Sequence, residues 1–227
     1  MSLTYAIPDL HGRVDLLQQA LSRIVEHSQG EAARVVTLGD YVDRGPNSRE
    51  VIELLMDWPF SRLQLVALKG NHEAMMWQVC NNLAEMGWWL ENGGGATLKS
   101  YGEAAQAALR NVIPAHHLEW IGNLPSVYAD ANRVFVHAGV DPLIPLAQQN
   151  DQTLLWKRYP KGFSQGHGTR HVVHGHHAHE RAPIVSKGKT NLDALAWKTG
   201  RLVIGVFCDS SPGGAVEFLE VLAPGSC

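Results

Sequence analysis

The first third of the chain alternates short apolar runs with segments of helical spacing, and this alternation restricts the fold more than any other feature. The apolar runs span 3–7, 33–38 and 62–68. Each ends in a polar turn, and apolar residues then recur with helical spacing over 13–27, from 48 onward and over 74–83. A strand, a loop and a helix repeated three times predict parallel strands covered by helices.

The second half of the chain is richer in strand patterns. Predicted strands span 126–130, 133–140, 171–176, 202–207 and 215–222. Helices are predicted over 104–109 and 116–124, and the KTGR segment (198–201) predicts a hairpin turn. Neither an internal repeat nor a low-complexity linker divides the chain, so the elements predict one α/β domain with two β-rich halves.

Charge and cysteine content exclude some classes of partner and compartment. The net charge is −3 and no run of lysine and arginine occurs, so we expect no nucleic-acid surface. The three cysteines form no CxxC pair, which favours a reducing compartment over a disulfide-stabilised secreted protein. No apolar run approaches 18 residues and no signal-peptide pattern is present, so we expect a cytoplasmic protein without a membrane partner. The sequence leaves the oligomeric state open.

Polar groups, most of them of types that bind metals, lie at or near the ends of five of the predicted strands. They are Asp9 and His11, then Asp40, Asp43 and Arg44, then Asn71, His72 and Glu73, and later His137 and His176. One such group would be an ordinary turn residue, but five strand ends with suitable ligands favour a shared site. Functional groups gather at the carboxyl ends of strands in open α/β sheets. Mixed nitrogen and oxygen ligands suit Mn, Fe or Zn.

Five short motifs occur in a fixed order along the chain. They read PDLHG, GDYVDRG, GNHE, VHAG and GHH. In this order they resemble the signatures of the phosphoprotein phosphatase group of metallophosphoesterases, most of all the phage lambda-like bacterial serine/threonine protein phosphatases. The resemblance covers residues 5–176. It implies a calcineurin-like metallophosphoesterase domain over 1–227, built as a β-sandwich of two mixed sheets flanked by helices.

The resemblance also implies two divalent metal ions, Mn²⁺ first, with Fe, Zn or Ni as alternatives. Asp9 and His11 would bind the first metal, Asp40 would bridge both, and the second would take Asn71, His137 and His176. Such a pair neutralises a phosphate dianion and generates a nucleophile near neutral pH. The implied reaction is direct attack by a metal-bridging hydroxide on a phosphomonoester.

The remaining motif residues have implied roles in proton transfer and phosphate binding. His72 resembles the general acid, and Asp43 the carboxylate that orients it. Arg44 and Arg158 resemble guanidinium clamps for phosphate oxygens, with Asn71 beside them.

The substrate and several residues stay open at this point. The resemblance favours protein phosphoserine or phosphothreonine. The alternatives are symmetrical hydrolysis of dinucleoside tetraphosphates, in a branch that tends to lack the equivalent of Asp43, and small phosphoesters. A catalytically silent metal-binding protein would have lost a ligand or the acid pair, and none is lost.

Some aromatic and histidine residues have no assigned role. Trp88 and Trp89 are expected in the core, with a place in the substrate wall as the alternative. The roles of His174, His177 and His179 are open, as is the effect of the NLDALAW segment (191–197), which replaces a DTG-like strand start in relatives.

Overall fold

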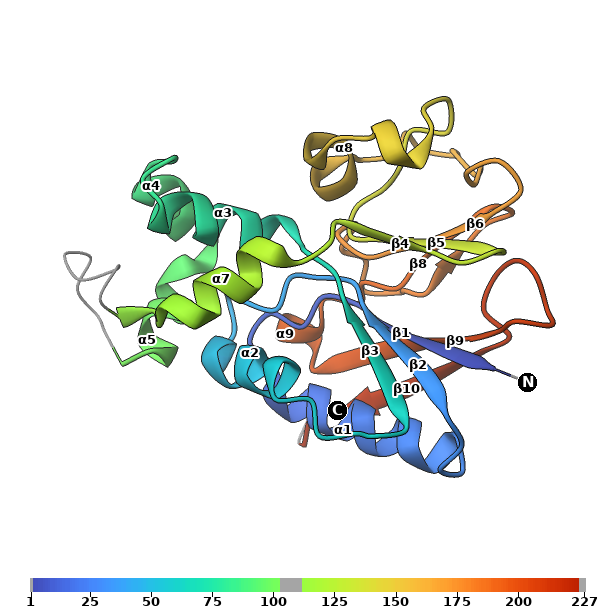
Figure 1. Cartoon of the computed structure of the whole chain (residues 1–227), viewed down its shortest axis with the longest axis horizontal. Coiled ribbons are helices and arrows are strands. Elements are labelled where there is room, and N and C mark those ends of the chain that lie inside the picture. The colour runs from blue at the N-terminus through green and yellow to red at the C-terminus, as the bar shows by residue number, and fades with distance from the viewer. Residues whose placement is uncertain (1, 103–111, 225–227) are drawn as a thin grey trace.

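Two five-stranded sheets lie face to face at the centre of the computed structural model, which describes residues 2–102 and 112–224 (Figure 1). The first sheet has the order β10-β9-β1-β2-β3. Its strands are β1 (Leu3–Ile7), β2 (Ala33–Thr37), β3 (Leu63–Ala67), β9 (Arg201–Cys208) and β10 (Glu217–Leu222). β1, β2 and β3 are parallel, as the alternating pattern predicts, and β9 and β10 join them in antiparallel pairing.

The second sheet has the order β4-β5-β6-β8-β7. Its strands are β4 (Val127–Ala129), β5 (Arg133–Val136), β6 (His171–His174), β7 (Ile184–Val185) and β8 (Lys189–Asn191). The three central strands are parallel, and antiparallel strands close both edges. The sequence pattern misses β7 and β8 because a two-residue strand and the polar run KTN carry no alternation.

Helices flank the two sheets. They are α1 (Val14–His27), α2 (Ser48–Met56), α3 (Asn71–Cys80), α4 (Met86–Trp89), α5 (Gly95–Ser100), α7 (Ala115–Asn123), α8 (Asp151–Trp156) and α9 (Ala196–Thr199), with a π-helical turn, η1 (Leu90–Gly94), and a 3₁₀ turn, η3 (Leu146–Gln148). In Figure 1, α1 and α2 lie below the first sheet and α8 lies above the second. The layers therefore run helix, sheet, sheet, helix, which confirms two mixed sheets flanked by helices.

Alternation along the strands divides the core between these layers. In β1, Tyr5 and Ile7 pack against the helices of the first sheet, whereas Ala6 faces the second sheet. In β5, Phe135 faces inward and its ring lies 5.6 Å from that of Phe207 in β9. Successive side chains of a strand point to opposite faces, so each buried strand serves two apolar layers.

Three sequence expectations need comment. The third helix begins at Asn71, three residues before the predicted start, so His72 lies on its first turn. The KTGR segment is not a hairpin, because α9 continues to Thr199 and Gly200 ends it with a left-handed backbone. The helix predicted over 104–109 lies outside the described residues.

Within residues 2–102 and 112–224, none of the helices combines the length and the apolar character that a membrane crossing requires.

Candidate metal centre

The predicted site residues come together where the carboxyl ends of β1, β2 and β3 meet those of β5 and β6. Several of them have a left-handed backbone. These are His11 (φ 44°), Asp40 (55°), Asp43 (72°), Arg44 (68°) and His176 (61°). Such conformations are costly for residues other than glycine and collect at functional sites. The left-handed backbone of these loop residues thus directs their side chains toward the candidate site.

Glycines beside the site residues allow the loops to approach closely. Gly39 has φ +95°, and a β-carbon there would overlap the backbone of Gly70. A β-carbon on Gly175 would overlap the carboxylate of Asp9. These two positions explain why a glycine precedes the acid of GDYVDRG and the predicted ligand histidine of GHH.

One group of convergent ligand atoms contains His11, Asp40 and His72. His11 donates from Nδ1 to the carbonyl of Val42 at 2.8 Å, so the neutral ring turns the lone pair of Nε2 toward the site. That Nε2 atom lies 3.5 Å from Oδ2 of Asp40. All three side chains are almost fully buried.

A second group contains Asp40, His137 and His176, so Asp40 belongs to both. His137 donates from Nδ1 to the carbonyl of Leu38 at 2.9 Å. Burial lowers the pKa of His137 to about 3, so its Nε2 carries a lone pair. This Nε2 atom of His137 lies 2.8 Å from Oδ1 of Asn71 and 3.4 Å from Oδ1 of Asp40.

These convergent nitrogen and oxygen atoms suit a cation bound between them. His176 adds a third, since its Nδ1 lies 3.1 Å from the same Asn71 oxygen. Burial also raises the pKa of Asp40 well above its usual range, and the charge of Asp9 raises it further. A bound cation would relieve both effects, so the residues present fit a metal site with mixed nitrogen and oxygen ligands.

Asp9 lies at the edge of these groups. Its carboxylate accepts hydrogen bonds from the backbone N–H of His176 at 3.1 and 3.2 Å. Burial raises the pKa of Asp9, and the nearby carboxylate of Asp193 raises it further. Asp193 is itself buried, and its pKa is raised to about 6 by that burial. A further carboxylate thus lies beside the predicted ligands.

An acid pair, His72 and Asp43, shares His72 with the first group. His72 donates from Nδ1 to Oδ2 of Asp43 at 2.7 Å, and both side chains are buried. Burial raises the pKa of Asp43 to about 7, while hydrogen bonds from Thr97 and Trp89 oppose the rise. Trp89 donates its indole N–H to both carboxylate oxygens at 2.9 and 3.0 Å, and Thr97 donates to Oδ1 at 2.6 Å.

The two predicted phosphate clamps differ in their surroundings. Arg44 donates to Nε2 of His11 at 2.7 Å and to Nε2 of His72 at 3.0 Å. Its backbone N–H donates to the carbonyl of Gly93, and its guanidinium lies over the ring of Trp197. Arg158 is exposed and makes no hydrogen bond or ion pair with the described residues. Its charge still lowers the pKa of His176, after the larger effect of burial.

Glu73 has a structural role that the sequence only suggested. It is fully buried, and its carboxylate accepts hydrogen bonds from four backbone N–H groups, those of Asp40, Tyr41, Val42 and Gly70. The sequence predicts a brace for the start of its helix. The side chain also fixes the loop that carries Asp40 and Asp43.

The open histidines lie at different depths. His174 is buried beside the ring of Tyr159, and its Nε2 has no hydrogen-bond partner among the described residues. His177 is half-buried and donates from Nε2 to the carbonyl of Lys157. His179 is exposed.

Sequence reasoning missed Thr97 as a neighbour of the site, and it did not predict the hydrogen bond from Trp89 to Asp43 or the bond from Arg44 to Gly93. The WWLENGGG segment offered one signal, because adjacent tryptophans followed by three glycines suit close packing. Trp89 is in the core, as expected, but Trp88 is 37% exposed, so the core expectation fails for Trp88.

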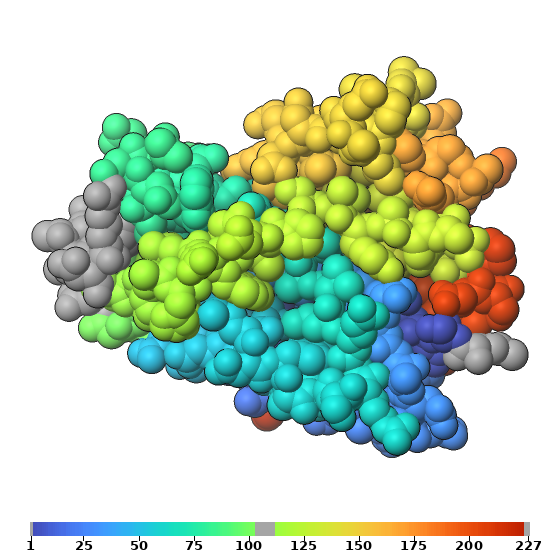
Figure 2. Space-filling view, viewed as in Figure 1, coloured from blue at the N-terminus to red at the C-terminus, as the bar shows by residue number. Residues whose placement is uncertain are grey.

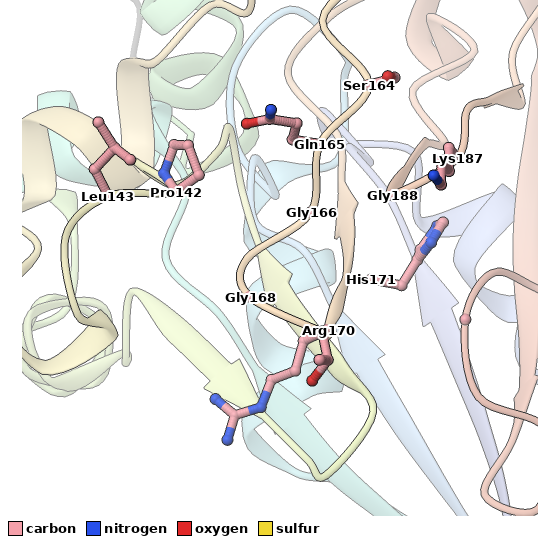
Figure 3. Close-up of a pocket in the computed structure, with 12 residues that line it drawn as sticks. Pro142, Leu143, Ser164, Gln165, Gly166, Gly168, Arg170, His171, Lys187 and Gly188 are labelled. Atoms are coloured by element: carbon pink, nitrogen blue, oxygen red, sulfur yellow. The ribbon is translucent and has the colours of Figure 1, made fainter.

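A separate cavity of about 640 Å³ lies at the opposite end of β6 (Figure 3). Pro142 and Leu143 form one side, and a glycine-rich loop that ends at Arg170 runs along it. His171, the first residue of β6, also lines it, whereas His176 of the candidate site follows the last residue of that strand. None of the predicted site residues contributes to this cavity.

Comparison with known proteins places the chain among phosphoesterases. A symmetrical bis(5'-nucleosyl)-tetraphosphatase of Neisseria meningitidis is 29% identical over 202 residues, which are 86% of this chain and 67% of that protein. Serine/threonine-protein phosphatase 2 of Escherichia coli is 30% identical over 117 residues, which are 52% of this chain and 50% of that protein. A crystal structure of a candidate diadenosine tetraphosphatase shares the fold, with a TM-score of 0.67, 21% identity, and coverage of 98% of this chain and 94% of that chain.

The family comparison covers most of the chain. The calcineurin-like phosphoesterase family matches residues 4–207, which include all five ordered motifs. This match confirms the metallophosphoesterase resemblance that the motifs indicate. The chain therefore belongs to the calcineurin-like phosphoesterase family.

Proposed function

We propose that the protein hydrolyses phosphomonoesters with two divalent metal ions, Mn²⁺ first among them. The proposed ligands are Asp9, His11, Asp40, Asn71, His137 and His176. The observation that carries this proposal is the pairing of two ligand groups that share Asp40 with the buried His72–Asp43 pair beside them. Metal ions at such a site supply charge neutralisation for the phosphate and lower the pKa of a bound water.

The side chains of the chain have separate tasks in this proposal. Arg44 grips two phosphate oxygens through its planar guanidinium, and Arg158 approaches from the exposed side. When Arg44 turns to phosphate, Nε2 of His72 is free to carry a proton. His72 then gives that proton to the departing oxygen, while Asp43 holds the ring and stabilises its charged form.

The acid pair favours phosphoserine and phosphothreonine of proteins as the substrate. An alkoxide is a poor leaving group, so its departure gains most from a positioned acid, typically about 10²–10⁴-fold. A small phosphoester with an alcohol leaving group would gain in the same way.

A second candidate is the symmetrical hydrolysis of dinucleoside tetraphosphates. It is supported by the similarity to the Neisseria tetraphosphatase, which extends over 86% of this chain, whereas the similarity to the Escherichia coli phosphatase covers 52%. The leaving group would then be a nucleoside diphosphate, which depends less on an acid than an alkoxide does.

The deciding experiment measures phosphate release by metal-stripped protein to which Mn²⁺ is returned. A phosphoserine peptide, a phosphothreonine peptide and diadenosine tetraphosphate are compared, with His72→Asn as the control. We expect metal-dependent peptide turnover that falls at least about a hundredfold in the variant. Preferential formation of two ADP would instead support the second candidate. If no phosphoester is turned over with any of Mn²⁺, Fe²⁺, Zn²⁺ or Ni²⁺, the proposed function is wrong.

A further inference from the structure

Two tryptophans from different parts of the chain stack beside the candidate metal centre. Trp88 in α4 and Trp156 at the end of α8 have ring centroids 5.9 Å apart and an interplanar angle of 23°. The ring of Trp156 lies 6.5 Å from that of His176 in an edge-on arrangement. Trp88 and Trp156 are here called the tryptophan pair. Its inner member, Trp156, therefore lies directly beside His176, a proposed metal ligand.

The two members are held differently. Trp156 is partly buried and packs against the core layers of both sheets, so its orientation is fixed. Trp88 is 37% exposed and packs into none of the core clusters among the described residues. An indole costs free energy when it is left in water, and core packing does not account for this one. The exposed ring is a surface suited to another flat group.

The surroundings of the tryptophan pair suit a ligand that also carries phosphate. Figure 2 shows a notch in the surface between α4 and α8, the two helices that supply the rings. Arg158 lies two residues after Trp156, is exposed, and forms no direct ion pair among residues 2–102 and 112–224, although its charge acts on the nearby Asp193. A guanidinium and a stacked aromatic surface on one side of a phosphate site are complementary to the two ends of a nucleotide.

We propose that the tryptophan pair is the stacking surface for the nucleobase of a nucleotide substrate whose phosphate lies at the candidate metal centre. The inference rests on the second candidate of the proposed function. The inference goes beyond that second candidate because it assigns the base to the exposed face of Trp88 and the first non-reacting phosphate to Arg158. Flat bases of any identity can stack in this way, so the surface would accept purines broadly.

The test compares two ligands that differ only by the base. Adenosine 5'-phosphate and ribose 5-phosphate are used as competitive inhibitors of Mn²⁺-dependent p-nitrophenyl phosphate turnover, at one fixed concentration of free Mn²⁺. Stacking of a base on an aromatic side chain predicts that the adenosine compound binds roughly tenfold more tightly. In Trp88→Leu this preference should fall to about twofold or less, and Trp88→Phe, which keeps an aromatic face, should retain most of it.

A matched control removes a tryptophan elsewhere. Trp58 donates its indole N–H to the carbonyl of Leu63, at the start of β3 and so at the end of the first sheet away from the metal centre. Trp58→Leu should leave the preference unchanged. A wild-type preference near one would overturn the inference, and so would a preference that survives in Trp88→Leu.

If the proposed function is wrong, the enzyme shows no turnover, and the inference is then tested by ligand binding instead. If no p-nitrophenyl phosphate is turned over, the binding of both ligands to the Mn²⁺-loaded protein is measured by calorimetry. A tighter adenosine complex that depends on Trp88 would support the inference although hydrolysis is absent. Equal binding of the two ligands would overturn it.

Discussion

A substitution of Trp89 provides the sharpest test of how the fold sets the pKa of Asp43 in the acid pair. Its indole N–H is one of three side-chain donors to the buried carboxylate of Asp43, together with Thr97 and His72. In Trp89→Phe that donor is lost while an aromatic ring remains. A hydrogen bond to a charged group is worth about 1.5–3 kcal/mol. Since one pKa unit corresponds to about 1.4 kcal/mol, the pKa of Asp43 should rise by roughly one to two units.

This rise predicts a loss of activity that depends on pH. From a pKa of about 7, the ionised fraction of Asp43 at pH 7 would fall from about one half to between a tenth and a hundredth. Activity relative to wild type should then be lower by about 5- to 50-fold at pH 7 and by no more than about twofold at pH 9. The assay is kcat/KM with p-nitrophenyl phosphate from pH 6 to 9.

Two controls separate this effect from general damage. Thr97→Val removes the hydroxyl donor to Asp43 and should shift the activity ratio in the same direction. Trp58→Phe, away from the site, should give a flat ratio. If Trp89→Phe lowers activity by one factor at every pH, Trp89 acts only through packing and the reasoning is refuted.

Three further predictions address other parts of the molecule. Arg44→Lys should lower kcat/KM at least about tenfold, because an ammonium cannot make the two parallel hydrogen bonds of a guanidinium, and equal kinetics would contradict the clamp role. Gly175→Ala should weaken Mn²⁺ binding at least about tenfold by displacing the carboxylate of Asp9, which titration calorimetry can detect. Burial lowers the pKa of His171 to about 4. The unfolded chain therefore binds more protons between pH 6.5 and 4, and the free energy of unfolding should fall as pH drops through that window. Urea unfolding of His171→Gln should show a shallower fall, and an unchanged pH slope would exclude His171 as its source.

The sequence predicts the parallel strands and the residues at their ends because both depend on local pattern. Short apolar runs mark β1, β2 and β3, and turn residues beside them mark Asp40 and Asn71. What the pattern cannot show is contact between distant segments. The bond from Trp89 to Asp43 spans 46 residues, and nothing near either one predicts it.

The local sequence pattern also could not predict the strained backbone of Asp40 or the exposure of Arg158. The left-handed backbone at Asp40 opposes its intrinsic preference and is stabilised by Glu73, which lies 33 positions later in the chain. The resemblance assigns Arg158 to the phosphate, and that role stays a prediction because the side chain forms no hydrogen bond or ion pair with the described residues. The proposed metal ligands likewise stay predictions until a metal is bound and located.

The division of the ligands between two sheets has a consequence for how the protein matures. Asp9, His11, Asp40 and Asn71 follow strands of the first sheet, whereas His137 and His176 follow strands of the second. His137 also donates to Leu38 and so fastens one sheet to the other. A nascent chain that has completed only its first 125 residues lacks one of the two ligand groups. Metal capture would then act as a late checkpoint, since ions that prefer the complete set would stabilise only the docked sandwich.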